Sequence, residues 1–273
     1  ATGAVDNPDH FRLAVRAVGA APRLKAGEYA LASGASLRSI IDTLVEGRSI
    51  LHAVTAPEGL TSAMIVRLVE ASPVLSGPAI EPIPAEGVLL PDTYMVRRGD
   101  TRQQVIARMI EARETLMAEL WPKRQPGLPI ETPEDAIILA SIVEKETALP
   151  EERPMVASVF VNRLRRGMRL ESDPTIIYGL TRGEPLGRGL YRSEMLRENP
   201  WSTYQIAGLP PTAICNPGRA SIEAVLNPPT SDALFFVADG SGGHAFAATY
   251  AEHLRNVAHW RRVEAGLVSG PAS

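Results

Sequence analysis

The chain has 273 residues, of which 45% are hydrophobic and 22% are charged, and its formal net charge is −3. These proportions are typical of a soluble globular protein, and the length suits one large domain or two ordinary ones. No run of Lys or Arg exceeds two residues, so duplex nucleic acid is disfavoured as the main partner, because phosphate binding depends on clustered cations. Cys215 is the single cysteine, which excludes an internal disulfide and a cysteine-based zinc site, and we expect it to be a small buried hydrophobe.

The beginning of the chain, ATGAVDNPDH, has no initiator Met. We interpret the sequence as a trimmed fragment of a parent protein, with any signal or membrane anchor lying upstream. No segment approaches the ~18 consecutive apolar residues of a membrane span, and we expect the fragment itself to be soluble.

The first part of the chain alternates short helices and strands. Ser36 suits the N-cap of a helix whose apolar residues recur at helical spacing, and Gly47 suits its C-terminal end. The elements predicted in chain order are a helix at 8–18, a strand at 26–34, a helix at 36–47, a strand and turn at 49–59, and a helix at 60–72. This β/α succession occurs twice at similar length, which indicates a weak internal repeat.

Prolines crowd residues 73–92, which we interpret as a connection, and helices dominate beyond it. Thr132 is the expected N-cap of a long helix with Pro133 at its first position, and Asp173 is the expected N-cap of a shorter one. The predicted elements are helices at 101–120, 132–149 and 153–167, a short helix at 172–180, a loop-rich stretch at 181–220, a strand, turn and strand at 233–250, and a terminal helix at 250–266. The whole pattern predicts an α+β fold.

Two glutamates end the helix that contains the sequence ILASIVEKET. Glu144 and Glu146 lie about 200° apart on a helix, so they cannot face the same way. Glu146 continues an apolar stripe through Leu139, Ile142 and Val143, so we expect it to emerge at the end of an apolar face. A partly desolvated carboxyl there would have a raised pKa, as a general acid needs. From geometry alone, the alternative is that both glutamates are solvated charges in the last turn of an ordinary helix.

Several motifs follow one another along most of the chain. They are KAGEY (25–29), EG (58–59), LLPDTY (89–94), LASIVEKET, ERPMVASVFVNRLRRGMRLESDPTIIYGL, STYQIAGLPPTAICNPG and LFFVADGSGGHAF. Together they closely resemble the MltG/YceG family of endolytic murein transglycosylases, over roughly residues 20–260. The resemblance implies a LysM-like β/α region at 1–86, associated with glycan-strand binding, and a lysozyme-like, mainly helical catalytic domain with a β-hairpin at 87–273.

The resemblance also implies an activity and a catalytic residue. The family cleaves the MurNAc-β-1,4-GlcNAc bond within nascent peptidoglycan strands without hydrolysis, leaves 1,6-anhydroMurNAc ends and terminates glycan elongation. The family's catalytic glutamate maps onto Glu146, which would act as acid and then as base without a second carboxylate. Glu144 is the runner-up for that role; otherwise it orients the loop or pairs with an arginine such as Arg163. Thr147 completes a Glu-hydroxyl pair like that of other lytic transglycosylases.

Other polar residues are candidates for substrate binding or support, each with a structural alternative. Asn162 and Arg163 could hydrogen-bond sugar or position Glu146, or they could be ordinary surface residues. Tyr204 could stack on a sugar ring or belong to the core. The remaining candidates are Asp173 and Thr175 as helix-capping groups that border the groove, Thr203 beside Tyr204, Asn216 as a cleft-lining or turn-forming residue, and His244 after the Gly-rich turn. The histidines are too scattered to predict a metal site.

The same resemblance sets the expected partners and location. It implies no cofactor and no metal. Peptidoglycan glycan strands are the expected partner, with penicillin-binding peptidoglycan synthases as further partners. The parent protein would be anchored in the bacterial cytoplasmic (inner) membrane, with this portion in the periplasm. Two alternatives are a non-catalytic peptidoglycan-binding module, against which the intact Glu146 argues, and a lysozyme-type glycan hydrolase, which product analysis for anhydro ends would distinguish.

Overall fold

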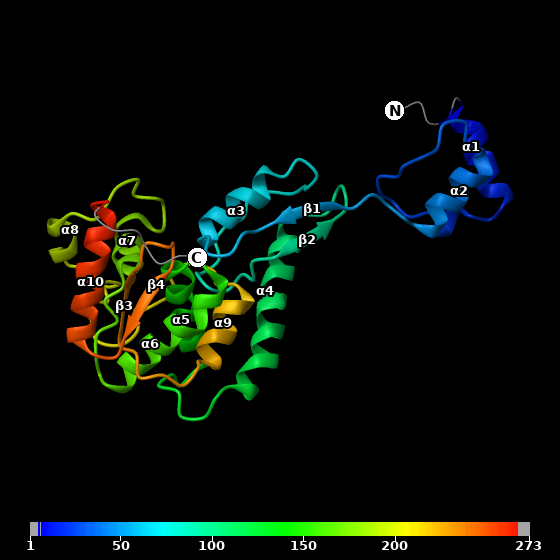
Figure 1. Cartoon of the computed structure of the whole chain (residues 1–273). Coiled ribbons are helices and arrows are strands. Elements are labelled where there is room, and N and C mark those ends of the chain that lie inside the picture. Colours follow the sequence, from blue (N-terminus) through cyan, green and yellow to red (C-terminus); the bar gives the residue numbers. More distant parts are fainter. Residues whose placement is uncertain (1–4, 6, 267–273) are drawn as a thin grey trace. The chain divides into compact units, whose positions relative to one another are not determined.

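The structure of the protein is a computed structural model, and it describes residue 5 and residues 7–266 (Figure 1). The chain forms two compact units. The first unit comprises residues 1–55, 67–80 and 93–105, and the second comprises residues 56–66, 81–92 and 106–273. Neither unit is one continuous stretch of sequence, because the boundary passes through α3 (Ser62–Ala71) and α4 (Arg102–Leu120). The functional boundary expected after residue 86 stays a prediction.

The first unit contains two short helices and a small sheet. Its elements are α1 (Pro8–Ala17), a 3-10 turn (Ala21–Arg23), α2 (Leu37–Glu46), β1 (His52–Thr55) and β2 (Thr93–Val96). β1 and β2 are antiparallel, with His52 opposite Val96. As predicted, the Ser36 side chain caps the start of α2, and Gly47 ends the helix in the left-handed conformation that glycine adopts without strain.

The prediction of a strand at residues 26–34 is wrong. The segment is extended but irregular, with a turn at Ser33 and Gly34. It is tied to the following segment by a hydrogen bond from the Ile50 amide to the Glu28 carbonyl, at 2.7 Å. A strand needs a neighbour that completes its ladder of hydrogen bonds. Here β1 begins only after Ile50 and pairs with β2, so the segment has no such neighbour among the described residues.

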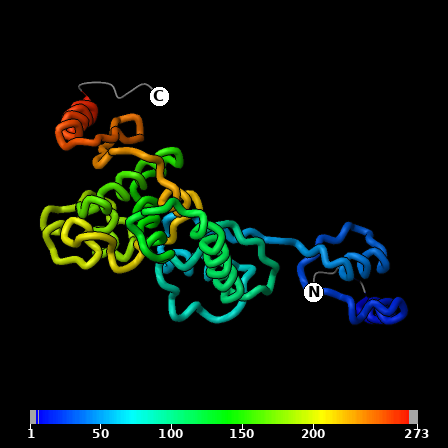
Figure 2. Tube along the Cα trace, turned by 90° about the horizontal axis from the view of Figure 1, so that it is seen from below, coloured from blue at the N-terminus to red at the C-terminus, as the bar shows by residue number. Residues whose placement is uncertain are grey.

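The second unit is mainly helical. Besides parts of α3 and α4, it contains 3-10 turns at Trp121–Lys123 and Pro150–Glu152, helices α5 (Pro133–Glu146), α6 (Arg153–Arg165), α7 (Asp173–Thr181), α8 (Arg192–Leu196), α9 (Arg219–Leu226) and α10 (Tyr250–Glu264), and strands β3 (Phe235–Ala238) and β4 (His244–Ala247). Helices α5, α6 and α9 pack against one another, and α10 packs on the antiparallel β3–β4 hairpin, which Figure 2 shows in orange beside the red helix. The combination of helices with small antiparallel sheets confirms the α+β class.

Helix α5 forms much of the core of the second unit. Thr132 and Asp135 make a reciprocal capping box at its start, and all eight residues from Ala136 to Val143 are buried. A helix that is buried on every side has to lie inside a domain, and α5 contacts α6, α7 and α9. It ends at Glu146, three residues earlier than predicted, because Thr147 takes up an extended conformation. The last turn of α5 therefore lies where the core gives way to loops.

Three features of the two units differ from the sequence expectations or lie beyond them. Helix α9 was not predicted, although Ile222, Val225 and Leu226 are buried at helical spacing and that spacing is visible in the sequence. The prediction of Asp173 as an N-cap is wrong, because Ser172 occupies the capping position and Asp173 is the first residue of α7. Strand β2 of the first unit was likewise not predicted, since its partner β1 is distant in sequence.

Cys215 is fully buried, as predicted, and burial raises the pKa of its thiol well above the ordinary value.

Within the part of the chain that the structure describes, no helix combines the length and the apolar character needed to cross a membrane.

Candidate active site

Glu146 is the last residue of α5 and has an enclosed carboxyl group. The residue as a whole is only partly exposed, and burial of the carboxyl raises its pKa to about 7. The negative charge of Asp173 raises the pKa further. Ser172 donates a hydrogen bond to Glu146 Oε1, and this bond lowers the pKa, as does the positive charge of Arg163; His244 lowers it only when its ring is protonated. A carboxyl with this pKa holds its proton about half of the time at neutral pH.

A buried hydroxyl network holds Ser172 in place. The Ser172 amide donates to Thr203 Oγ1 at 2.9 Å, and the Thr203 amide donates to Thr175 Oγ1 at 3.1 Å. The Thr175 hydroxyl also donates to the Ser172 carbonyl at 2.6 Å. Thr175 and Thr203, both candidates from the sequence, are completely buried. Thr175 and Thr203 therefore fix the position of Ser172 through these hydrogen bonds. Ser172 itself was not among the site residues predicted from the sequence.

Asp173 and Tyr204 form a second pair beside Glu146. The Tyr204 hydroxyl donates to Asp173 Oδ1 at 2.9 Å. Burial, together with the negative charge of Asp173, raises the pKa of Tyr204, so the phenol stays protonated at any physiological pH. The Asp173 side chain is thus held at the start of α7 by a tyrosine. Stacking of Tyr204 on a sugar ring stays a prediction.

Glu144 faces away from Glu146 and is bound on all sides. Its side chain is 4% exposed and pairs with Arg153 at 3.0 Å. The other carboxylate oxygen accepts hydrogen bonds from the Gly218 amide at 3.0 Å and from the Ser221 hydroxyl at 2.7 Å. The prediction that Glu144 pairs with Arg163 is therefore wrong. Arg153 at the start of α6 and residues at the start of α9 bind the Glu144 carboxylate instead. The reading of Glu144 as a solvated surface charge is also wrong.

Asn162 and Arg163 bind the segment that leads into β3. The Asn162 amide donates to the carbonyls of Ser231 and Ala233, at 2.9 and 3.1 Å. Arg163 is 8% exposed, and its guanidinium donates to the Leu234 carbonyl at 2.7 Å and to two carbonyls at 169 and 170. These contacts place both side chains inside the protein, so the surface alternative is wrong for Arg163. Neither side chain is in hydrogen-bond contact with Glu146.

Asn216 is completely buried, which contradicts the expectation that it lines a cleft. Its side-chain oxygen accepts from the Leu89 amide at 3.0 Å. Its side-chain nitrogen donates to the Leu60 carbonyl and to the Ser62 hydroxyl, both at 3.1 Å. Asn216 therefore links three segments that are distant in the sequence, all within the second unit.

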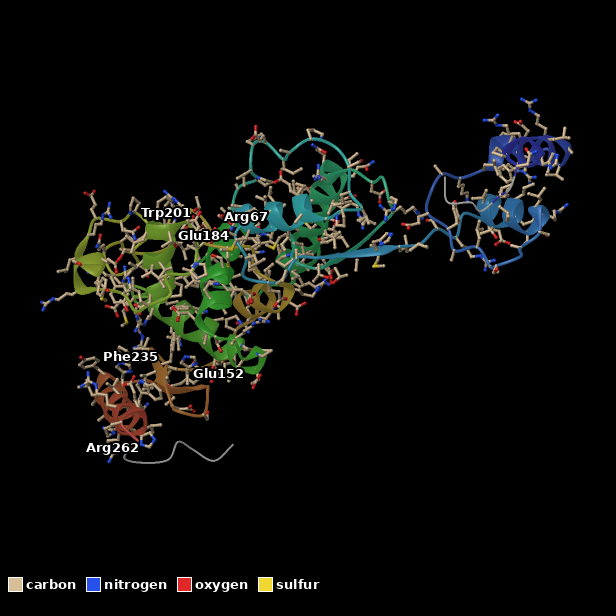
Figure 3. The ribbon with its side chains drawn as sticks, turned by 90° about the horizontal axis from the view of Figure 1, so that it is seen from above. Arg67, Glu152, Glu184, Trp201, Phe235 and Arg262 are labelled. Atoms are coloured by element: carbon tan, nitrogen blue, oxygen red, sulfur yellow. The ribbon has the colours of Figure 1, made fainter. Side chains whose placement is uncertain are left out.

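Thr147 and His244 meet at Glu152, which Figure 3 labels beside the β3–β4 hairpin. The Thr147 hydroxyl donates to Glu152 Oε2 at 3.0 Å. His244 Nδ1 lies 2.7 Å from the same oxygen, and the His244 amide donates to Glu152 Oε1 at 2.6 Å. Thr147 directly follows Glu146, and through Glu152 it is hydrogen-bonded to the same carboxylate as His244, so this group borders the same site.

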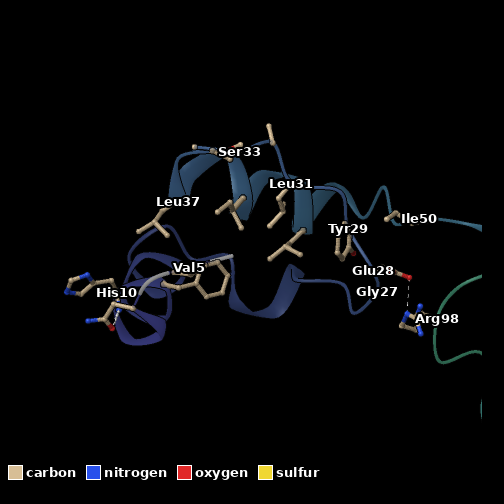
Figure 4. Close-up of a pocket in the computed structure, with 17 residues that line it drawn as sticks. Val5, His10, Gly27, Glu28, Tyr29, Leu31, Ser33, Leu37, Ile50 and Arg98 are labelled. Carbon is tan, nitrogen blue, oxygen red and sulfur yellow. Dashed lines mark hydrogen bonds and ion pairs between the residues drawn. The ribbon is translucent and has the colours of Figure 1, made fainter. Parts of the chain in front are cut away.

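A separate cavity of about 1180 Å³ lies within the first unit (Figure 4). The irregular segment 27–35 forms much of its wall, together with residues of α1 and α2. Phe11 and Leu31 contribute apolar surface, and the ion pair between Glu28 and Arg98, at 2.9 Å, contributes charge. A cavity of mostly apolar lining with a few polar groups is the usual form of a small-molecule site.

Known proteins resemble this chain in sequence and in structure. It is 33% identical over 170 residues to the endolytic murein transglycosylase of Bacillus subtilis, which covers 62% of this chain and 46% of that protein. It is 33% identical over 180 residues to the endolytic murein transglycosylase of Streptococcus pneumoniae, covering 63% of this chain and 32% of that protein. The chain therefore spans less than half the length of these curated relatives.

A solved structure and a family model cover far more of the chain. The crystal structure of a YceG-like protein from Listeria monocytogenes superimposes with a TM-score of 0.61 and 29% sequence identity, over 91% of this chain and 90% of that one. The model of the YceG-like family matches residues 1–259, which includes the whole first unit, most of the second and every residue of the site around Glu146. The chain belongs to the YceG-like family.

Proposed function

We propose that this protein is an endolytic murein transglycosylase, a lyase that cleaves the MurNAc-β-1,4-GlcNAc bond within peptidoglycan strands. The curated relatives bear the name of that activity. The observation that carries the proposal is the carboxyl of Glu146, which burial keeps at a pKa of about 7. A group with this pKa can give a proton to a leaving oxygen and take one back at the same pH.

In the proposed mechanism Glu146 first protonates the glycosidic oxygen and the bond to C1 of the muramoyl sugar breaks. The C6 hydroxyl of the same sugar then attacks C1, and Glu146 accepts its proton, which closes the 1,6-anhydro ring. Ordinary glycosidases need a second carboxylate as nucleophile or base. Here Glu144 is bound to Arg153 and α9, and Asp173 is bound to Tyr204, which supports a mechanism with one catalytic carboxyl.

The proposal is tested by product analysis with purified peptidoglycan. The wild-type protein should release fragments with anhydro ends, and Glu146→Gln should lose at least a hundredfold in rate, because general acid–base catalysis contributes about that much or more. Glu144→Gln is the matched control on the neighbouring carboxyl. Reducing ends in place of anhydro ends would identify a lysozyme-type hydrolase, and binding without any cleavage would identify a binding module.

We further propose a supporting role for the first unit and a cellular setting for the enzyme. The region up to residue 86 is LysM-like and binds glycan strands. The cavity lined by Glu28 and Arg98 supports this proposal. Co-sedimentation of the full chain with sacculi, compared with Tyr29→Ala in the cavity wall, tests this. By family resemblance, the parent protein is anchored in the inner membrane, faces the periplasm and terminates glycan elongation near penicillin-binding synthases.

A further inference from the structure

Glu152 binds one residue of the β3–β4 hairpin at two points. Its Oε1 accepts from the His244 amide at 2.6 Å, and its Oε2 lies 2.7 Å from His244 Nδ1. The Glu152 side chain is 14% exposed and that of His244 is 18% exposed. Burial alone would raise the pKa of Glu152, but the hydrogen bonds from His244 and Thr147 outweigh it and lower the pKa. Glu152 is therefore an ionised carboxylate, and it can only accept hydrogen bonds.

The hairpin is shaped to allow this contact. A Cβ atom added to Gly243 would lie 2.7 Å from Glu152 Oε1 and 3.4 Å from a methyl group of Leu149. Such a contact is too close for a side chain, so the glycine lets the backbone approach the carboxylate. The imidazole edge also meets the Phe236 ring, with centroids 5.3 Å apart and planes at 88°. The orientation of the His244 ring is thus set on two sides.

These contacts assign the proton of the imidazole. Because the Glu152 carboxylate has no proton to donate, His244 Nδ1 must carry the hydrogen that lies between them. In the neutral ring the opposite nitrogen, Nε2, then has a free lone pair. It has no hydrogen-bond partner among the described residues, and it is not one of the buried polar atoms that lack a partner there. Nε2 is therefore open to solvent, in a group that adjoins Glu146 through Thr147.

We propose that His244 is a substrate-binding residue of the Glu146 site and that Glu152 is its positioning residue. Nε2 accepts a hydrogen bond from a hydroxyl or an acetamido N–H of the sugar that lies at Glu146. The inference rests on the proposed function, since it names a contact of the same glycan substrate. Thr147 connects this group to Glu146, because it directly follows Glu146 and its hydroxyl donates to the Glu152 carboxylate that orients the His244 ring.

Two substitutions of His244 separate its ring nitrogens. In His244→Asn the amide can replace Nδ1 and keep the contact with Glu152, but nothing replaces Nε2. In His244→Gln the longer side chain can place its amide oxygen where Nε2 was. With soluble uncrosslinked glycan strands as substrate, we expect His244→Asn to raise KM about 3- to 10-fold, the value of one hydrogen bond, with kcat within about twofold. His244→Gln should recover most of that loss.

Glu152→Gln tests the positioning role. It removes the charge that fixes the ring, so KM should rise as in His244→Asn, and adding His244→Asn to it should have little further effect. His259→Asn, a histidine on α10 outside this group, is the control. Thermal unfolding of each variant identifies any loss of folded protein. To separate binding from turnover, glycan affinity is also measured on Glu146→Gln with and without His244→Asn.

An unchanged KM and an unchanged affinity in His244→Asn would overturn the inference, as would a fall in kcat alone. A KM for His244→Gln as high as that for His244→Asn would also contradict the role of Nε2. These outcomes are distinct from failure of the proposed function, which would appear as a wild-type protein that forms no anhydro ends.

Discussion

The raised pKa of Glu146 predicts that removing its charge stabilises the folded protein at high pH. The pKa is about 7 in the folded protein, against 4.5 for an exposed glutamate. The folded state therefore binds the proton more tightly than the unfolded state. Below pH 4.5 both states are protonated and folding carries no penalty. Between pH 4.5 and 7 the penalty grows, and above pH 7 it reaches about 3 kcal/mol, at 1.36 kcal/mol per pKa unit.

Glu146→Gln removes this penalty with little change in shape. The glutamine side chain is neutral at every pH, and its oxygen can still accept from Ser172. We expect the variant and the wild-type protein to be equally stable near pH 4. Above pH 7 the variant should be more stable, by up to about 3 kcal/mol. Other ionisable groups are common to both proteins, so their contributions cancel in the difference.

Urea unfolding followed by tryptophan fluorescence suits this measurement. All three tryptophans, Trp121, Trp201 and Trp260, belong to the second unit, which also contains Glu146, so the signal reports the part of the chain where the effect arises. The free energy of unfolding is compared at pH 4, 6 and 8. A difference that is the same at all three pH values, or a variant that is less stable at pH 8, would refute the assignment of a raised pKa.

Three other substitutions test the site and the packing of the helix that carries it. Ser172→Ala removes a hydrogen bond that lowers the pKa of Glu146, so the alkaline fall of kcat/KM should move to higher pH; a profile that stays in place would exclude the bond as a determinant. Glu144→Ala removes a carboxylate with a side chain only 4% exposed, and with it one of the two ion pairs of Arg153 and the acceptor of the Gly218 amide and the Ser221 hydroxyl. It should cost about 3 kcal/mol in urea unfolding, whereas an exposed glutamate changed to Ala should cost less than about 0.5 kcal/mol. Gly87 has a φ of +79°, and in Gly87→Ala the added Cβ would lie 2.5 Å from a methyl group of Ile137 in α5. The variant should lower the free energy of unfolding by about 1–3 kcal/mol. A calorimetric midpoint equal to that of the wild-type protein would contradict the close packing.

Much of the architecture could be predicted from local patterns. The caps Ser36 and Thr132, the glycine after α2 and the apolar spacing of α5 act within a few residues, and the structure has these helices where the sequence predicted them. The strand expected at 26–34 is wrong for the converse reason. Its residues suit an extended backbone, but a strand also requires a partner from elsewhere in the chain.

The two glutamates show the same limit at the site. Helical spacing correctly predicted that Glu144 and Glu146 point to different sides of α5. It could not predict that the side chain of Glu144 is only 4% exposed, because Arg153, Gly218 and Ser221 come from other helices and loops. The expected partner Arg163 was plausible by charge alone, and only the packing of α6 decided which arginine reaches the carboxylate.

What the sequence by itself determined is most of the helices, the capped starts of α2 and α5, the hairpin, and a carboxylate placed at the end of an apolar helix. Those features depend on periodicity and capping within about one or two helical turns. What only the tertiary structure decided is the environment of Glu146. The hydroxyl of Ser172 lies 26 positions further along the chain than Glu146, and His244 binds Glu152 across a separation of 92 positions. The packing of distant segments determines which residues become partners. This packing raises the pKa of Glu146 and surrounds Glu144 with its binding partners.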